Sequence, residues 1–245
     1  MDLLPVILTI ITASTPLLLA ATGELITEKS GVLNLGVEGM MLIGAIAAFA
    51  TAVSTGSALL AILAGAFSGA LVASVFAVLT LIFLANQVAT GLALTIFGVG
   101  LSALIGSNFV GVALEPLPKL NVDGVSTIPI LGKILFNHDV LVYLSFGMIF
   151  LVGWFLSKTR AGLILRAVGE SHDSAHALGY SIITVRYLAV IFGGFMSGLG
   201  GSYLSLVYTP LWAENMATTS TSLAGTTFTL KAAACTINAW ALAVR

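Results

Sequence analysis

Long apolar segments alternate with short polar ones along most of this chain. Six apolar segments approach or exceed the ~20 residues that a helix needs to cross a bilayer. They cover residues 3–21, 40–53, 58–84, 88–105, 140–156 and 187–207. The second reaches this length only together with the residues before it. The pattern predicts an all-α fold, a polytopic membrane helix bundle with about six to seven spans.

The composition supports an integral membrane protein. Hydrophobic residues make up 58% of the chain and charged residues only 8%, against roughly 25% charged residues in soluble domains. The net charge of −1 gives no indication of a nucleic-acid partner, and one cysteine, Cys235, excludes a disulfide framework. Residues 1–21 lack the basic start of a cleavable signal peptide. We interpret them as the first membrane helix.

Residues 23–44 are unusually polar for a position between two apolar segments. Charged groups are rare at membrane depth and usually line a cavity or pair with another group. The charged and amide residues are Glu24, Glu28, Lys29, Asn34 and Glu38. Glycines punctuate the stretch, which suits a broken or re-entrant second segment, and on a helix Asn34 and Glu38 would share one face. We expect these two residues to line a path; a cytoplasmic loop before a capped helix is the alternative.

A second polar group lies at the start of the fourth apolar segment. It consists of Asn86, Gln87 and Thr90. Asn86 and Thr90 are four residues apart and would share a helix face. They are candidates for the same path, although ordinary hydrogen bonding between membrane helices explains them equally well.

The two long polar segments predict the topology. Residues 107–139 contain two cations, whereas residues 157–186 contain four: Lys158, Arg160, Arg166 and Arg186. The positive-inside rule therefore places the second segment in the cytoplasm and the first outside. Counting back through the helices places the N-terminus outside as well.

The basic segment contains signals for a short helix over residues 172–178. Ser171 suits its N-cap and Gly179 suits the C′ position. A helix of two turns does not persist alone in water, so we expect it to pack against the membrane surface or a partner. His172 and His176 are four residues apart, but the HExxH pattern is absent and no metal site is expected.

Three motifs together resemble the permease subunits of ABC importers of the ribose, branched-chain amino acid and nucleoside type, closest to the nucleoside and simple-sugar branch. Residues 23–44 are similar to that branch's G-E-x-x-T-E-[RK]-x-G-x-x-N-L-G-x-E-G-x-M signature. Residues 166–179 are similar to the family's coupling loop, R-A-x-G-E-N-P-x-A-A-x-x-x-G, with Ser171 and His172 in place of Asn-Pro. Asn86, Gln87 and Gly91 resemble its N-Q-x-x-x-G helix start.

The resemblance implies a transporter subunit of the bacterial cytoplasmic (inner) membrane that passes a nucleoside or simple sugar. It implies three partners: a separate ATP-binding subunit at the cytoplasmic face, a second permease chain, and an external substrate-binding protein or lipoprotein. The coupling loop would contact the ATPase through Arg166, Gly169, Glu170, Ala175, Ala177 and Gly179. P-loop, GxSxG and Rossmann patterns are absent from the sequence. We therefore expect no cofactor and no catalytic residues, and the protein is not expected to be an enzyme.

Two alternatives remain open at this point. A secondary transporter or channel would use the carboxylates of residues 23–44 for ion coupling and would need no ATPase. A non-functional fragment is the other, because residues 217–245 form an atypical Thr- and Ser-rich tail without a convincing span, as a truncation or frameshift would produce. Residues 1–216 are expected to form the transmembrane permease domain.

Overall fold

The computed structural model describes residues 3–114, 139–171, 179–208 and 212. These residues fold into α-helices joined by short connections. The helices are α1 (Leu3–Lys29), α2 (Val37–Thr55), α3 (Ala58–Ala77), α4 (Gln87–Gly106), α6 (Val140–Lys158), α7 (Arg160–Glu170) and α9 (Ile182–Tyr203). Short π-helical segments, η1 (Val78–Ile82) and η3 (Leu204–Tyr208), extend α3 and α9. The predicted all-α class is confirmed.

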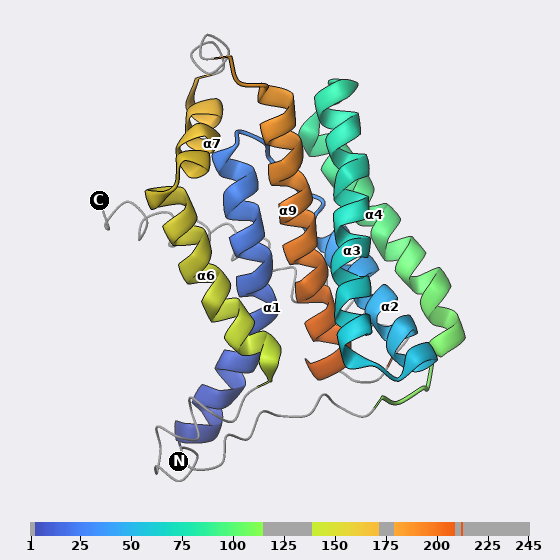
Figure 1. Cartoon of the computed structure of the whole chain (residues 1–245). Coiled ribbons are helices and arrows are strands. Elements are labelled where there is room, and N and C mark those ends of the chain that lie inside the picture. The colour runs from blue at the N-terminus through green and yellow to red at the C-terminus, as the bar shows by residue number, and fades with distance from the viewer. Residues whose placement is uncertain (1–2, 115–138, 172–178, 209–211, 213–245) are drawn as a thin grey trace.

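Within the described residues, six helical segments are long and apolar enough to cross a membrane. They are Ile10–Lys29, Val37–Thr55, Ala58–Ile82, Gln87–Phe109, Val140–Lys158 and Ile182–Tyr208. Consecutive spans alternate in direction, so that α1, α3 and α6 run upward in Figure 1 while α2, α4 and α9 run downward. This arrangement confirms the predicted polytopic helix bundle.

Helix α9 lies at the centre of the bundle. It packs against α1, α2 and α3, with α1 and α6 to its left in Figure 1 and α3, α2 and α4 to its right. Glycines bring the backbones together, because a Cβ added at Gly44 would lie 2.7 Å from the Cα of Gly198, and one at Gly23 would lie 2.9 Å from the carbonyl oxygen of Gly193. Close approach through small residues is typical of membrane helices.

The first helix differs from its prediction. It was expected to end near Ala21 but continues to Lys29. Two polar residues of the added turns have tertiary partners: the Oε1 atom of Glu24 accepts a hydrogen bond from the backbone of Asn34, and the hydroxyl of Thr27 lies 3.3 Å from the carbonyl oxygen of Ala189. Because both side chains form hydrogen bonds inside the bundle, the polar residues do not end the helix.

The basic segment also differs, because it begins with a helix that the sequence did not predict. Helix α7 buries Leu165 and Val168 while Arg160 and Glu170 are exposed. Ser171, expected as an N-cap, stands at the C-terminal end of α7. The predicted helix over residues 172–178 and the predicted tail over residues 217–245 lie outside the described residues.

Candidate functional site

A non-helical connection, residues 30–36, separates α1 from α2. It divides the polar stretch that the sequence singled out into the end of α1, the connection itself and the start of α2. Gly31 adopts a φ of +83°, which favours glycine. Ser30, Val32 and Asn34 are buried. Buried irregular backbone needs hydrogen-bond partners for its N–H and C=O groups, and here side chains supply several of them.

Asn34 and Glu24 hold the second half of the connection. The backbone N–H of Asn34 donates to Oε1 of Glu24 at 3.3 Å. The backbone N–H of Gly36 donates to Oδ1 of Asn34 at 3.0 Å, and the Asn34 side-chain amide lies 3.6 Å from the sulfur of Met40. The Asn34 side chain therefore shapes the turn from which α2 begins.

Two side chains of α4 hold the connection from the other side. Oε1 of Gln87 accepts a hydrogen bond from the backbone N–H of Leu33 at 2.9 Å. The hydroxyl of Thr95 donates to the carbonyl oxygen of Leu35 at 3.1 Å. Gln87 at the start of α4 and Thr95 near its middle thus bind the irregular backbone of the connection.

The remaining polar residues at the start of α4 have separate roles. Asn86 is the N-cap of α4, and its Oδ1 accepts from two backbone N–H groups of the first turn. Thr90 is half-buried one turn later. A Cβ added at Gly91 would lie 3.0 Å from the backbone nitrogen of Leu35, so that glycine lets α4 approach the connection closely.

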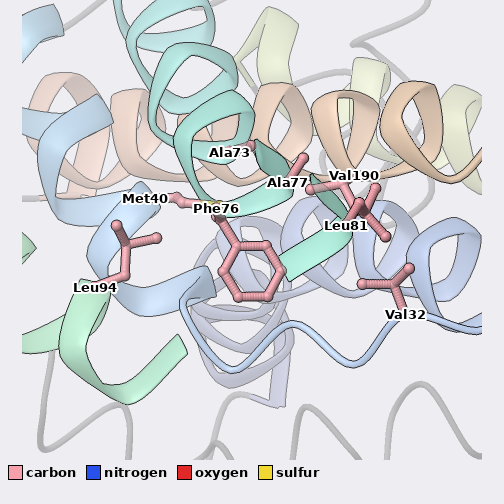
Figure 2. Close-up of a cluster of buried hydrophobic side chains, with 8 residues drawn as sticks. All are labelled: Val32, Met40, Ala73, Phe76, Ala77, Leu81, Leu94 and Val190. Carbon is pink, nitrogen blue, oxygen red and sulfur yellow. The ribbon is translucent and has the colours of Figure 1, made fainter. Parts of the chain in front are cut away.

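An apolar cluster anchors the first half of the connection. Figure 2 shows Val32 of the connection in one cluster with side chains from the surrounding helices. The ring of Phe76 lies near the middle of this cluster. The other members are Met40, Ala73, Ala77, Leu81, Leu94 and Val190. Val32 and Phe76 are almost completely buried, so the connection is fixed by apolar packing as well as by hydrogen bonds.

The connection also touches the end of α7. A Cβ at Gly169 of α7 would clash with the carbonyl oxygen of Lys29, and one at Gly31 would lie 3.4 Å from the Cα of Gly169. Arg186 of α9 donates from Nε to the carbonyl oxygen of Ser30 at 3.1 Å. The turn between α1 and the connection is therefore enclosed by α7 on one side and by Arg186 on the other.

The predicted path residues are only partly brought together. Gln87 binds the residue that precedes Asn34, so these two side chains hold neighbouring parts of the connection. Glu38 is half-buried in the first turn of α2, where the helix dipole favours a carboxylate. Asn34 lies before α2 begins, so the expected helical i, i+4 relation to Glu38 does not hold, because residues 30–36 are not helical.

The predicted coupling residues are described in part. Arg166, Gly169 and Glu170 lie in the second half of α7. Gly179 adopts a φ of +80°, the conformation that the C′ position requires. Ala175 and Ala177 lie outside the described residues.

Sequence reasoning missed the role of Arg186. It was counted only as a cation of the basic segment, yet it lies within the last candidate span and reaches the first turn of the connection. A charged residue inside an apolar span is itself a signal of a specific partner. That signal was visible in the sequence. The identity of the partner was not, because Ser30 lies 156 residues away along the chain.

The charges of the described residues are unevenly distributed. All the lysines and arginines in the described part lie on α7, at the ends of α1 and α6, or near the start of α9. They are Lys29, Lys158, Arg160, Arg166 and Arg186. These parts of the helices lie on the same side of the bundle, toward the top of Figure 1. By the positive-inside rule this end faces the cytoplasm. In the described part no group of three His, Cys, Asp or Glu residues could hold a metal ion.

Within the described residues, a bundle of six candidate spans packed through glycines, with a non-helical connection at one end, defines the class: a multi-pass membrane protein. The family model for the permease component of branched-chain amino acid transport systems matches residues 6–237. The chain belongs to this permease family. The matched range continues past Met216 into the atypical tail.

Several named proteins are similar to the chain. A Haloferax volcanii protein provisionally named a glucose ABC transporter permease is 39% identical over 83% of this chain and 63% of its own length. The guanosine ABC transporter permease of Bacillus subtilis is 32% identical over 82% of this chain and 68% of its own length. A nucleoside ABC transporter permease of Lactococcus lactis is 32% identical over 77% of this chain and 63% of its own length. The chain thus spans about two thirds of these relatives. No solved structure matches it.

Proposed function

We propose that this chain is the permease subunit of an ABC importer that passes a nucleoside or a simple sugar into the cell. The observation that carries the proposal is the direct packing of α7, at the cytoplasmic end, on the turn that begins the connection. The family match supports the permease role, and relatives named for glucose, guanosine and nucleosides support the substrate class.

The connection is the proposed gate of the path. Asn34, Glu38, Asn86, Gln87 and Thr90 line or control it. A segment held by a few side-chain hydrogen bonds changes conformation at lower cost than a regular helix, in which every turn is bonded internally. Amide, hydroxyl and carboxylate groups also offer both donors and acceptors to the hydroxyls of a sugar or ribose.

The proposed drive comes from a separate ATP-hydrolysing subunit. It docks on residues 166–179, through Arg166, Gly169, Glu170, Ala175, Ala177 and Gly179. A partner that displaces the end of α7 displaces the turn at Lys29 with it, because Gly169 packs directly on the carbonyl oxygen of Lys29 and leaves no room between them. A second permease chain and an external substrate-binding protein complete the proposed importer.

Uptake of radiolabelled guanosine, ribose and glucose by cells carrying the whole system tests the path. Glu38→Gln keeps the shape and removes the charge, so we expect uptake to fall while the amount of membrane-inserted protein is unchanged. Glu28→Gln is the matched control, since Glu28 is also half-buried but belongs to the end of α1. Normal uptake by both Glu38→Gln and Asn34→Ala would reject the proposed gate.

Co-purification of the ATPase subunit tests the docking surface. Gly179→Val changes backbone shape without changing charge, because valine strains a φ of +80°. We expect it, and Ala175→Arg, to weaken co-purification and to separate ATP hydrolysis from uptake. If both variants bind the ATPase and transport normally while Arg166→Glu alone abolishes uptake, the segment serves as a charged membrane-surface anchor instead.

A further inference from the structure

An apolar cavity of about 390 Å³ lies between α6, α7 and α9, near the cytoplasmic end of the bundle. It is many times larger than the ~10–15 Å³ that a single water needs on the same measure. Its walls include Phe155, Ile164, Leu188 and Phe192. The cavity is separate from the connection, because residues 30–36 do not line it.

The cavity opens to the surface within a membrane-spanning part of the molecule. Leu188 of α9 lines it and is 61% exposed. Leu151 of α6 also lines it and is 50% exposed. Both residues belong to candidate spans, so the opening meets hydrocarbon chains. An acyl chain therefore fits both the chemistry of the walls and the surroundings of the opening.

Cations and one tyrosine lie at the cytoplasmic end of this cavity. Lys158 shares a face of α6 with Leu151 and Phe155, at i+7 and i+3. Arg160 precedes Ile164 by one turn of α7. Both cations are exposed. Tyr180 lines the cavity and is 45% exposed, and tyrosine suits a boundary where one end of the ring is apolar and the other polar.

We propose that this cavity binds an anionic phospholipid of the cytoplasmic leaflet, with one acyl chain between α6, α7 and α9 and the headgroup phosphate at Lys158 and Arg160. Basic sites between membrane helices on the cytoplasmic side are suited to anionic headgroups. The two exposed charges where α6 ends and α7 begins, Lys158 and Arg160, are both positive, whereas the exposed Glu170 stands at the other end of α7. The cavity walls contain no acidic residue. The bound lipid fills the space between α7 and the bundle and so holds α7 in place.

Native mass spectrometry of the purified protein, with any subunits that co-purify, tests the site. The probes are phosphatidylglycerol and phosphatidylcholine with identical acyl chains. We expect one phosphatidylglycerol to be retained in preference to phosphatidylcholine. Lys158→Gln and Arg160→Gln should each weaken its retention about fivefold. Both residues are exposed, so neither change disturbs the fold.

A steric pair of variants tests the acyl-chain part. Ala161→Phe places a ring in the cavity that Ala161 lines, and we expect the retained lipid to be lost. Leu163→Phe is the matched control, since Leu163 lies on the same helix, is 61% exposed and does not line the cavity. Equal retention of the two lipids, retention unaffected by both glutamine variants, or loss in Leu163→Phe but not in Ala161→Phe would overturn the proposal. A wild-type protein that retains no lipid would overturn it as well, since another group would then fill the cavity.

Discussion

The two sides of the central helix are packed in opposite ways. Toward α2 and α3, helix α9 makes backbone contacts through glycines: a Cβ at Gly69 would clash with the carbonyl oxygen of Gly194, and one at Gly201 with that of Met41. Toward α1 a similar glycine contact joins Gly23 and Gly193. Toward α6 and α7 the contacts are instead between larger side chains such as Val152, Leu165 and Phe192. The cavity lies on that second side, next to α7.

The difference concerns what each side can accommodate. Side chains can change rotamer around an added group, whereas two backbones in contact can only move apart as whole helices. We infer that the glycine side is the rigid frame of the bundle, and that the side with α6 and α7 can repack. The proposed docking segment is attached to the side that can repack, where a partner's movement meets less resistance.

Gly201→Ala should have the largest effect, because it tests the rigid side directly. Its Cβ would clash with the Met41 carbonyl oxygen and lie 2.9 Å from the backbone nitrogen of Ala45. We expect a loss of about 3 kcal/mol in folding free energy, the upper part of the range for overpacked sites. Thermal unfolding in detergent, followed by size-exclusion chromatography, measures it.

Gly147→Ala is the control for this prediction. Gly147 lies inside α6, and a Cβ there would meet nothing within 4 Å. Replacing an unconstrained helix glycine by alanine stabilises a helix by roughly 0.5–1 kcal/mol. If Gly201→Ala is as stable as Gly147→Ala, the two sides do not differ in rigidity and the comparison fails.

Gln87→Leu should have a smaller effect. It removes the acceptor of the Leu33 N–H while it keeps the size of the side chain. Hydrogen bonds between membrane helices contribute about 0.6 kcal/mol on average and up to about 1.7 kcal/mol, so we expect a loss of about 1 kcal/mol. Ser74→Ala is the control, because the exposed Ser74 hydroxyl bonds only within its own helix. An equal unfolding temperature for both variants would mean that the connection is held by Val32 and its apolar cluster alone.

The spans were predictable from the sequence, but their polar ends were not. Apolar segments of about twenty residues locate the six spans, since hydropathy depends on local composition. The end of α1 depends on Thr27, whose hydroxyl lies 3.3 Å from the carbonyl oxygen of Ala189, 162 residues further along the chain. No local pattern contains that contact, and so the helix was predicted to end too early.

The site shows the same division between local and distant information. Asn34, Gln87 and Glu38 could be selected because polar residues at membrane depth are rare. The hydrogen bond between the Gln87 side chain and the Leu33 backbone could not be predicted, because it joins two segments 54 residues apart. Helix α7 was missed because it is short and has both apolar positions, such as Leu165 and Val168, and charged ones, so it does not form a long apolar segment.

The last prediction makes the same substitution on both sides. Ala66 is fully buried on the rigid side, and a Cβ at Gly198 would lie 3.0 Å from its Cα. Ala161 lines the cavity and is exposed. Ala66→Leu should cost about 1–3 kcal/mol because it forces backbones apart. Ala161→Leu should change the folding free energy by no more than about 0.5 kcal/mol, because its added atoms enter existing space.

Thermal unfolding of both variants in one detergent measures the difference. Equal losses would show that α7 is held as rigidly as the glycine side, and the proposed route from the docking segment to the connection would then require the whole bundle to move.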